Sequence, residues 1–112
     1  GMPVFDLIIL GMGNDGHIAS IFPDCLNLID DQRICAATRH PATKMKRVTL
    51  TGSTIKNSKK IFFMITGKGK ASGVSEVMNN SATAKLLPAY YIEPANGSMI
   101  WFLDETAASS IS

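Results

Sequence analysis

The chain of 112 residues is 46% hydrophobic and 18% charged, a composition that can build the core of one domain and is unlike a disordered segment. A formal net charge of +2 is too small to favour nucleic acid or an anionic membrane surface as a partner. The longest apolar stretches, residues 4–10 and 61–65, are far shorter than the roughly 20 residues that span a bilayer.

Neither a secretion signal nor a metal motif is recognisable. No charged N-terminal region is followed by an apolar run and a cleavage site, and Gly1, ahead of Met2, is interpreted as the remnant of a tag. Cys25 and Cys35 lack metal-ligand spacing, so free thiols in a reducing compartment are expected. We therefore expect a cytoplasmic protein with no metal, no nucleic-acid partner and no membrane partner.

Apolar, β-rich segments alternate with segments of helical pattern along the chain. Residues 4–10 and 60–66 are the clearest buried strands, and residues 70–78 carry apolar side chains at helical spacing. Weaker signals predict further elements: strands at residues 33–38, 47–51 and 99–103, an edge segment at 90–92, a helical turn at 17–21 stopped by Pro23, a short helix capped by Ser53 and running to residue 59, and a closing helix at 105–111 capped by Asp104.

This alternation predicts an α/β fold in a single domain over residues 1–112, with a partial Rossmann-like layered sheet flanked by helices. Two glycine-rich loops follow the clearest strands, one after Leu10 and one after Thr66. If the strands are parallel, both loops open on the edge formed by the carboxyl ends of the strands, where ligands bind in α/β proteins. The sequence therefore predicts a ligand site at this edge.

Gly11, Gly13 and Gly16 match G-x-G-x-x-G, the glycine pattern of dinucleotide-binding loops. That pattern needs a long helix to hold the pyrophosphate, and Pro23 stops a helix here within about two turns. It also needs an acidic residue at the end of the next strand, where residues 37–39 read ATR. A dinucleotide is therefore not expected, and the glycines are interpreted as bare, permissive backbone beside a ligand.

Asp15 and His17 stand two residues apart on the same loop. Histidine titrates near neutrality, so it can accept and return a proton, and a nearby carboxylate can orient the imidazole and stabilise its cation. The alternative is structural, with Asp15 capping a short helix that begins at His17. The second histidine, His40, lies in a polar link and is expected at the surface.

The segment around this pair is more specific than the pair itself. Residues 6–23, DLIILGMGNDGHIASIFP, closely resemble the active-site segment of the 6-phosphogluconolactonases. Further segments resemble this family in the same order along the chain: residues 47–51 (RVTLT), 66–71 (TGKGKA), 87–89 (LPA) and 101–105 (WFLDE). Several motifs in one order are far more specific than one glycine-rich loop, and the resemblance covers essentially the whole chain from Phe5.

The resemblance implies hydrolysis of 6-phosphoglucono-1,5-lactone to 6-phosphogluconate in the pentose phosphate pathway, with no metal or organic cofactor. It implies that His17 is the catalytic base, which takes a proton from the attacking water and returns it to the leaving ring oxygen. Asp15 would orient or electrostatically support His17. Backbone amides of the loop that holds Gly11, Gly13 and Gly16 would bind substrate and stabilise the oxyanion.

The phosphate of such a substrate requires fixed positive charge. Lys70 is the first choice because it follows Gly69 and opens a helix, whose free N–H groups and dipole favour an anion. Arg47 is the second, since a guanidinium binds phosphate with two hydrogen bonds, and Lys68 is a weaker candidate. A P-loop does not explain this segment, because Ala71 stands where Ser or Thr is needed. The alternative for these cations is a solvated basic face.

A sister family, the glucosamine-6-phosphate deaminases and isomerases, shares the fold and the Asp-Gly-His loop, and Ile18 is more typical of that family. Its deaminases carry a glutamate directly before the proline of this segment, which assists ring opening. This chain has Phe22 there, and phenylalanine cannot move protons. The lactonase interpretation is therefore preferred, and a deaminase or isomerase activity remains the alternative.

Lactonases of this family are about twice as long as this chain, which resembles their C-terminal half. The absent half would supply another phosphate loop and several strands, so a bare sheet edge and exposed apolar surface are expected to drive self-association. The 112 residues alone are expected to have little or no activity. A non-catalytic fragment that binds sugar phosphates is the further alternative.

Overall fold

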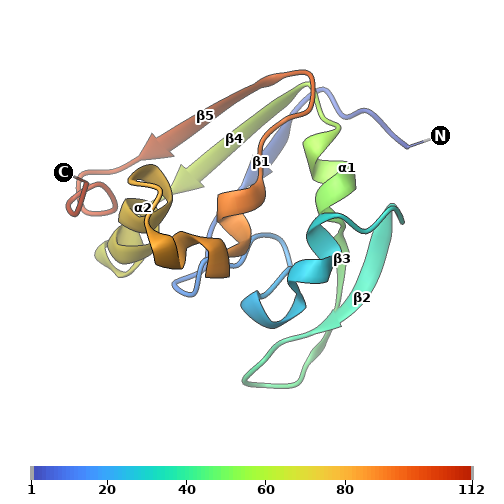
Figure 1. Ribbon diagram of the computed structural model, residues 1–112, viewed down its shortest axis with the longest axis horizontal. Coiled ribbons are helices and arrows are strands. Elements are labelled where there is room, and N and C mark those ends of the chain that lie inside the picture. Colours follow the sequence, from blue (N-terminus) through green and yellow to red (C-terminus); the bar gives the residue numbers. More distant parts are fainter. Residues whose placement is uncertain (1, 112) are drawn as a thin grey trace.

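The computed structural model describes residues 2–111, and Gly1, the predicted tag remnant, lies outside them. Its central element is a three-stranded parallel sheet in the order β1-β4-β5 (Figure 1). The strands are β1 (Ile8–Leu10), β4 (Lys60–Ile65) and β5 (Ser98–Leu103). Ile8 lies opposite Ile61 in a parallel register, and β5 continues the sheet in the same direction. The loops that follow the strands therefore open on one edge, and the predicted α/β fold with a parallel sheet is confirmed.

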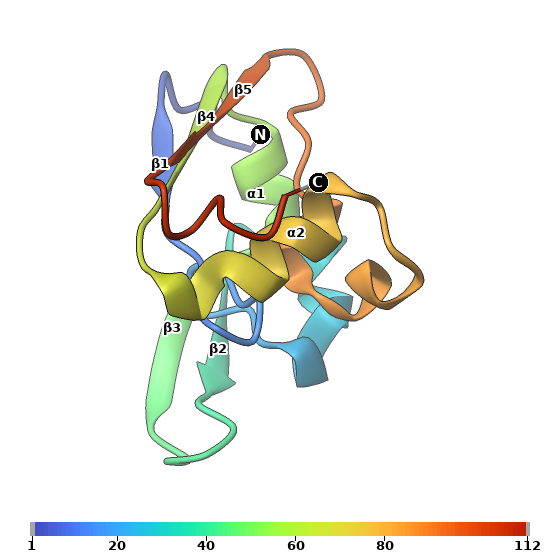
Figure 2. The ribbon, with the colours of Figure 1, turned by 90° about the vertical axis from the view of Figure 1, so that its left-hand side faces the viewer.

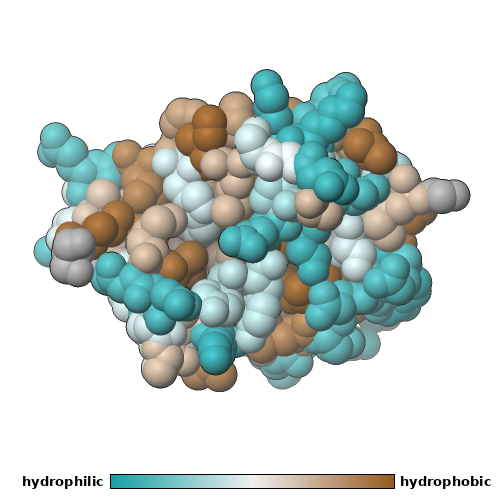
Figure 3. All heavy atoms as spheres, turned by 45° about the horizontal axis from the view of Figure 1, so that its top comes forward, coloured by the Kyte–Doolittle hydropathy of each residue, from teal (hydrophilic) through white to brown (hydrophobic). Residues whose placement is uncertain are grey.

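Helices cover only one face of this sheet. The two α-helices, α1 (Gly52–Lys56) and α2 (Ala71–Met78), lie on the same side of it (Figure 2). On the opposite face, Ile9, Met64 and Phe102 are 57%, 55% and 46% exposed. Apolar side chains also reach the surface among hydrophilic ones in the view of Figure 3. A parallel sheet normally buries both faces, so within the described residues this one lacks a covering layer.

The covered face supplies the core. Strand side chains alternate between the two faces, so every second residue of β4 points toward the helices. The buried side chains of this face and of the helices that pack on it include Leu10, Ile61, Phe63, Ile65, Ile55 and Val74.

The strands predicted at residues 33–38 and 47–51 pair with each other and not with the main sheet. They form the antiparallel hairpin of β2 (Cys35–Arg39) and β3 (Lys46–Leu50). The hydroxyl of Thr49 accepts a hydrogen bond from the Ser20 N–H at 3.0 Å. This bond joins the hairpin to the segment that follows the loop after β1.

The helical turn predicted at residues 17–21 is wrong. Ile18 and Ile21 form an isolated antiparallel bridge across a tight turn, in which Ala19 has φ +48°. Both isoleucines are fully buried, so packing of their side chains outweighs the local helix preference. Pro23 begins the 3-10 helix Pro23–Ile29 instead of stopping a helix, a position where its missing N–H is not needed.

The strand predicted at residues 4–10 is confirmed only for its last part, Ile8–Leu10. Ile8 pairs with Ile61, the second residue of β4, so at most one further residue of this segment could lie opposite that strand. Val4, expected to be buried, is 56% exposed.

Two predicted boundaries near helices also differ. The cap of α1 is Thr51 and not Ser53, because the Thr51 hydroxyl accepts the Thr54 N–H at 3.4 Å. The edge segment predicted at residues 90–92 lies instead at the end of the 3-10 helix Pro88–Tyr91, which Pro88 begins.

The closing helix predicted at residues 105–111 is a series of turns. Asp104 does accept the Ala107 N–H at 2.8 Å, as a cap would. However, the Ser109 hydroxyl donates to the Thr106 carbonyl at 2.7 Å, and such local bonds compete with helical hydrogen bonding.

The helix predicted at residues 70–78 is observed as α2, preceded by the short 3-10 helix Lys68–Lys70. A further 3-10 helix, Ala82–Leu86, follows it. None of the helices within residues 2–111 has both the length and the apolar character needed to cross a membrane.

Candidate active site

Asp15 and His17 form a hydrogen-bonded pair in the loop after β1. The Asp15 carboxylate oxygen Oδ1 accepts the backbone N–H of His17 at 3.0 Å and lies 2.6 Å from the Nδ1 atom of its ring. A carboxylate only accepts hydrogen bonds, so Nδ1 is the donor of this pair. The other ring nitrogen, Nε2, is then left to accept a proton, which is the arrangement that a general base requires.

The carboxylate of this pair is held in its ionised form. Partial burial alone raises the pKa of Asp15, but the hydrogen bonds from the backbone and ring of His17, together with the histidine charge, outweigh that effect. The pKa of Asp15 is therefore lower than the ordinary aspartate value. An ionised carboxylate orients the imidazole and stabilises the cation that forms when the ring takes up a proton.

Two of the three predicted glycines shape the loop around this pair. A Cβ atom at Gly13 would collide with the His17 ring, so only glycine leaves room for the imidazole there. Gly16 has φ +84°, and a Cβ at this position would lie 2.8 Å from Leu87. Short backbone bonds close the loop, with the Gly13 N–H donating to the His17 carbonyl and the Gly16 N–H to the Gly13 carbonyl, both at 2.9 Å.

A fully buried aromatic side chain supports the imidazole from behind. The ring centre of Phe22 lies 4.8 Å from that of His17, and the Phe22 side chain is 0% exposed. On its other side, Phe22 contacts His40 edge to face at 5.2 Å. His40 is half-buried rather than fully at the surface, and its Nδ1 atom accepts the N–H groups of Ala42 and Thr43.

His17 and Lys70 line the same pocket, which has a volume of about 360 Å³. Lys70 enters it from the loop after β4, while His17 enters from the loop after β1. The Nζ atom of Lys70 donates a hydrogen bond to the Met12 carbonyl, so the two loops are in direct contact. The lining residues are Gly11, Met12, Gly13, His17, Ala19 and Lys70.

The pocket unites some of the predicted site residues and not others. Asp15 contributes through its bonds to His17, and Gly16 through the loop backbone, without lining the pocket. Arg47 is exposed on β3 and is not among the lining residues. It shares a face of the strand with Thr49, which bonds Ser20, so it points to the side of the hairpin nearer the loop. Its assignment to the phosphate stays a prediction.

Sequence reasoning missed two residues of the lining, Met12 and Ala19. Met12 contributes the carbonyl that binds Lys70, and any residue type supplies a carbonyl. Ala19 lies in the tight turn between Ile18 and Ile21, which was predicted as helix. Neither residue carries a side-chain signal from which its position is predictable.

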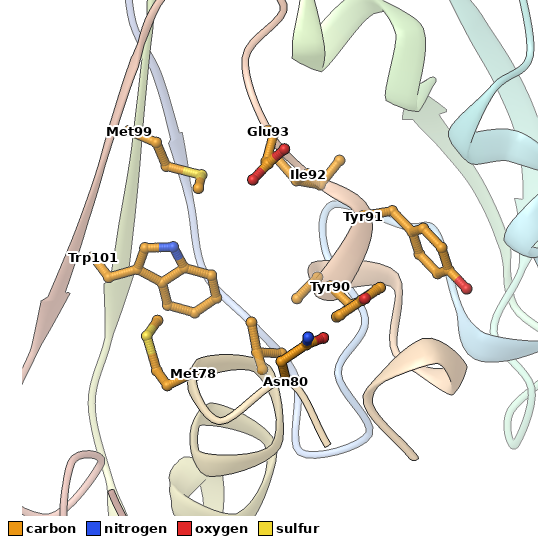
Figure 4. Close-up of a pocket in the computed structure, with 10 residues that line it drawn as sticks. Met78, Asn80, Tyr90, Tyr91, Ile92, Glu93, Met99 and Trp101 are labelled. Atoms are coloured by element: carbon orange, nitrogen blue, oxygen red, sulfur yellow. The ribbon is translucent and has the colours of Figure 1, made fainter. Parts of the chain in front are cut away.

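A larger hollow of about 650 Å³ lies between β5, the end of α2 and the 3-10 helix Pro88–Tyr91. Figure 4 shows the Trp101 indole facing it, with Met78 and Met99 on either side of the ring. The Trp101 ring is also stacked on Phe63, with the ring centres 3.9 Å apart. Glu93 is the only Asp or Glu among the lining residues, and no Lys, Arg or His joins it, so the hollow offers no acid–base pair or cation for a phosphate.

Comparisons with known proteins identify the family of this chain. A family model described as glucosamine-6-phosphate isomerases/6-phosphogluconolactonase matches residues 1–101. A 6-phosphogluconolactonase of Aggregatibacter actinomycetemcomitans is 40% identical over 105 residues, which are 94% of this chain and 45% of that protein. The chain thus spans about 45% of the length of this curated relative.

Solved structures give the same result. The crystal structure of a devB protein superposes with a TM-score of 0.92 at 35% identity, over 99% of this chain and 46% of the other. A 6-phosphogluconolactonase from Leishmania guyanensis superposes with a TM-score of 0.84 at 32% identity, over 99% and 43% of the two chains. The chain belongs to the family of glucosamine-6-phosphate isomerases and 6-phosphogluconolactonases.

Proposed function

We propose that the protein hydrolyses 6-phosphoglucono-1,5-lactone to 6-phosphogluconate. The observation that carries the proposal is the single pocket shared by His17, a base oriented by Asp15, and Lys70, a cation from the neighbouring loop. Lactone hydrolysis needs a proton acceptor for water, and a phosphorylated substrate needs a fixed positive charge at a distance from the reacting carbonyl. The relatives named 6-phosphogluconolactonase support the same choice.

In the proposed reaction, the Nε2 atom of His17 takes a proton from the water that attacks the lactone carbonyl. The imidazolium, paired with Asp15, then gives the proton to the ring oxygen as it leaves. The amides of Gly13 and Gly16 already donate to loop carbonyls. We therefore assign stabilisation of the oxyanion to other backbone amides of this loop.

The phosphate is assigned to Lys70. An ammonium carries three donors, and Met12 uses one of them, which leaves two for phosphate oxygens. Lys70 directly precedes α2, so the positive end of the helix dipole adds to its attraction for an anion. Arg47 is the second proposed cation.

The complete site is proposed to include residues that this chain does not carry, and the 112 residues alone are proposed to have little or no turnover. The chain spans 45% of the length of the Aggregatibacter relative. Catalysis by positioning requires the lactone, the water and the base to be held together, and a partial cradle loses most of that effect.

The test uses the complete gene product that contains this chain. Ring opening of the phospholactone is monitored through the acid that it releases. Ammonia release from glucosamine-6-phosphate is measured on the same sample. We expect lactone hydrolysis without ammonia release, because Phe22, which is buried beside His17, stands where the deaminases carry the glutamate that assists ring opening. Ammonia release without lactone hydrolysis would move the assignment to the deaminases.

A further inference from the structure

The loop after β5 is bonded to the loop after β4 at the carboxyl edge of the sheet. Both carboxylate oxygens of Asp104 lie within hydrogen-bonding distance of the Gly67 N–H, at 3.2 and 3.3 Å. On its own side, the carboxylate accepts the Thr106 hydroxyl at 3.0 Å and the Ala107 N–H at 2.8 Å. The Asp104 N–H donates to the Ile65 carbonyl at 3.3 Å. Asp104 is therefore anchored and holds the first peptide of the neighbouring loop.

Gly67 directly precedes the 3-10 helix Lys68–Lys70 and caps its first turn. It has φ +100°, a backbone conformation that residues other than glycine rarely adopt. Its carbonyl accepts the Lys70 N–H at 3.2 Å. The orientation of this glycine therefore sets the start of the 3-10 helix Lys68–Lys70. That helix in turn sets the direction from which Lys70 enters the pocket with His17.

The hydrogen bonds from Ala107 and Gly67 favour the charged form of the carboxylate. Although desolvation opposes them, they lower the pKa of Asp104 below the ordinary aspartate value. A charged carboxylate near a phosphate site repels the phosphate, so its direct electrostatic effect on the substrate is unfavourable. Any favourable effect of Asp104 on phosphate binding must therefore come through the Gly67 backbone, to which it is hydrogen-bonded.

We propose that Asp104 is a positioning residue for phosphate recognition, which acts by fixing Gly67 and thereby Lys70. This inference rests on the proposed function. The predicted change in affinity for a phosphorylated ligand is opposite in sign to the change that a simple charge effect would cause. Removing the carboxylate weakens binding of a phosphorylated ligand if Asp104 positions Lys70, whereas loss of a repelling charge alone strengthens it.

The experiment compares binding of 6-phosphogluconate and gluconate by calorimetric titration of the complete gene product. We expect Asp104→Ala to weaken binding of 6-phosphogluconate by about tenfold, the size of one lost charge-assisted hydrogen bond, and to leave gluconate binding unchanged. Asp104→Asn keeps one acceptor oxygen and should lie between wild type and Asp104→Ala. Glu105→Gln, at an exposed neighbour, removes the same charge and should not weaken binding.

Amide hydrogen exchange verifies that the effect is local. Asp104→Ala should speed exchange of the Gly67 amide and leave that of Phe63, in the middle of β4, protected. If Asp104→Ala binds 6-phosphogluconate as tightly as wild type or more tightly, the inference is overturned and the proposed function stands. If wild type itself does not prefer 6-phosphogluconate to gluconate, the proposed phosphate site fails, and the inference with it.

Discussion

Lys70, directly before α2, donates a hydrogen bond to the carbonyl of Met12 in the loop after β1. The loops also touch elsewhere, since a Cβ at Gly69 would lie 3.2 Å from the Asn14 side chain. The proposed phosphate cation and the proposed base are therefore parts of one bonded unit, assembled from segments far apart in the sequence. This arrangement preorganises charge and base before substrate arrives, which reduces the entropy lost on binding.

Replacement of Lys70 tests the phosphate assignment. Lys70→Ala removes the ammonium from the pocket, so binding of 6-phosphogluconate should weaken while binding of gluconate changes little. Hydrogen bonds to charged groups contribute roughly 1.5–3 kcal/mol, which corresponds to tenfold or more in affinity. Calorimetric titration of both ligands with the complete gene product measures the difference, and equal losses for both ligands would remove Lys70 from the phosphate site.

Arg47 is tested against its neighbour in the hairpin. Arg47→Ala is expected to weaken binding of 6-phosphogluconate more than binding of gluconate. The reason is that Arg47 lies on the same face of β3 as Thr49, which contacts the segment after the His17 loop. Lys46→Ala is the matched control, since this cation is also exposed but points to the opposite face of β3. Similar affinities for the two variants would make Arg47 part of a solvated basic face.

Gly13 is predicted to be required because any side chain at this position would overlap the His17 ring. Gly13→Ala places a methyl group where the imidazole lies, so the ring must shift and its hydrogen bond to Asp15 must change. Gly11→Ala serves as the control for ring geometry, because a Cβ there meets no atom within 4 Å. The nitrogen chemical shifts of the His17 ring, measured by NMR, report the bond to Asp15. An unchanged ring spectrum in Gly13→Ala would contradict the predicted collision.

The lowered pKa of Asp15 predicts how its contribution to stability depends on pH. A carboxyl group with a depressed folded pKa stabilises the fold above the unfolded value of about 3.9 and loses that contribution as the pH falls through the folded value. Asp15→Asn should therefore lower the free energy of unfolding more at about pH 5 than at about pH 2, because protonation of the Asp15 carboxyl progressively removes its contribution as the pH falls. Urea unfolding at the two pH values measures this, and an equal loss at both would exclude the charged interaction with His17.

The uncovered face of the main sheet predicts self-association of the 112-residue chain. Met64 and Phe102 are half-exposed there, and burial of apolar surface contributes about 25 cal/mol per Å². Light scattering should show oligomers, which the double substitution of Met64→Lys with Phe102→Lys reduces. Val48→Lys is the control, because this side chain is 76% exposed but lies on the hairpin. A monodisperse wild-type monomer would refute the prediction.

Much of the fold was predictable where local pattern and tertiary packing agree. The apolar runs before the two glycine-rich loops predicted that both loops follow strands of one sheet, and the structure places them at the carboxyl edge of a parallel sheet. The tight turn at Ile18 and Ile21 was not predictable, because burial of both side chains decides it. The separate pairing of β2 with β3, outside the main sheet, was also not predictable, because the sequence of a short strand does not indicate which strand it pairs with.

The candidate site was predictable in its side chains and less so in its backbone. Asp15, His17 and Lys70 are recognisable because their chemistry is in their side chains. The Met12 carbonyl and the Gly67 N–H take part through main-chain atoms, which every sequence offers at nearly every position. Their roles follow only from how the loops meet in space.

His17 is proposed to be the base of a lactone hydrolysis. The most direct measurement is kcat for the phospholactone in the complete gene product, compared between wild type, His17→Ala and His40→Ala. His40 is the matched control, because it contacts the other side of Phe22 and does not line the pocket. We predict a decrease of ~10²–10⁴-fold for His17→Ala, the usual contribution of general acid–base catalysis, and near-normal kcat for His40→Ala. A His17→Ala enzyme with near-normal turnover would exclude His17 as the base.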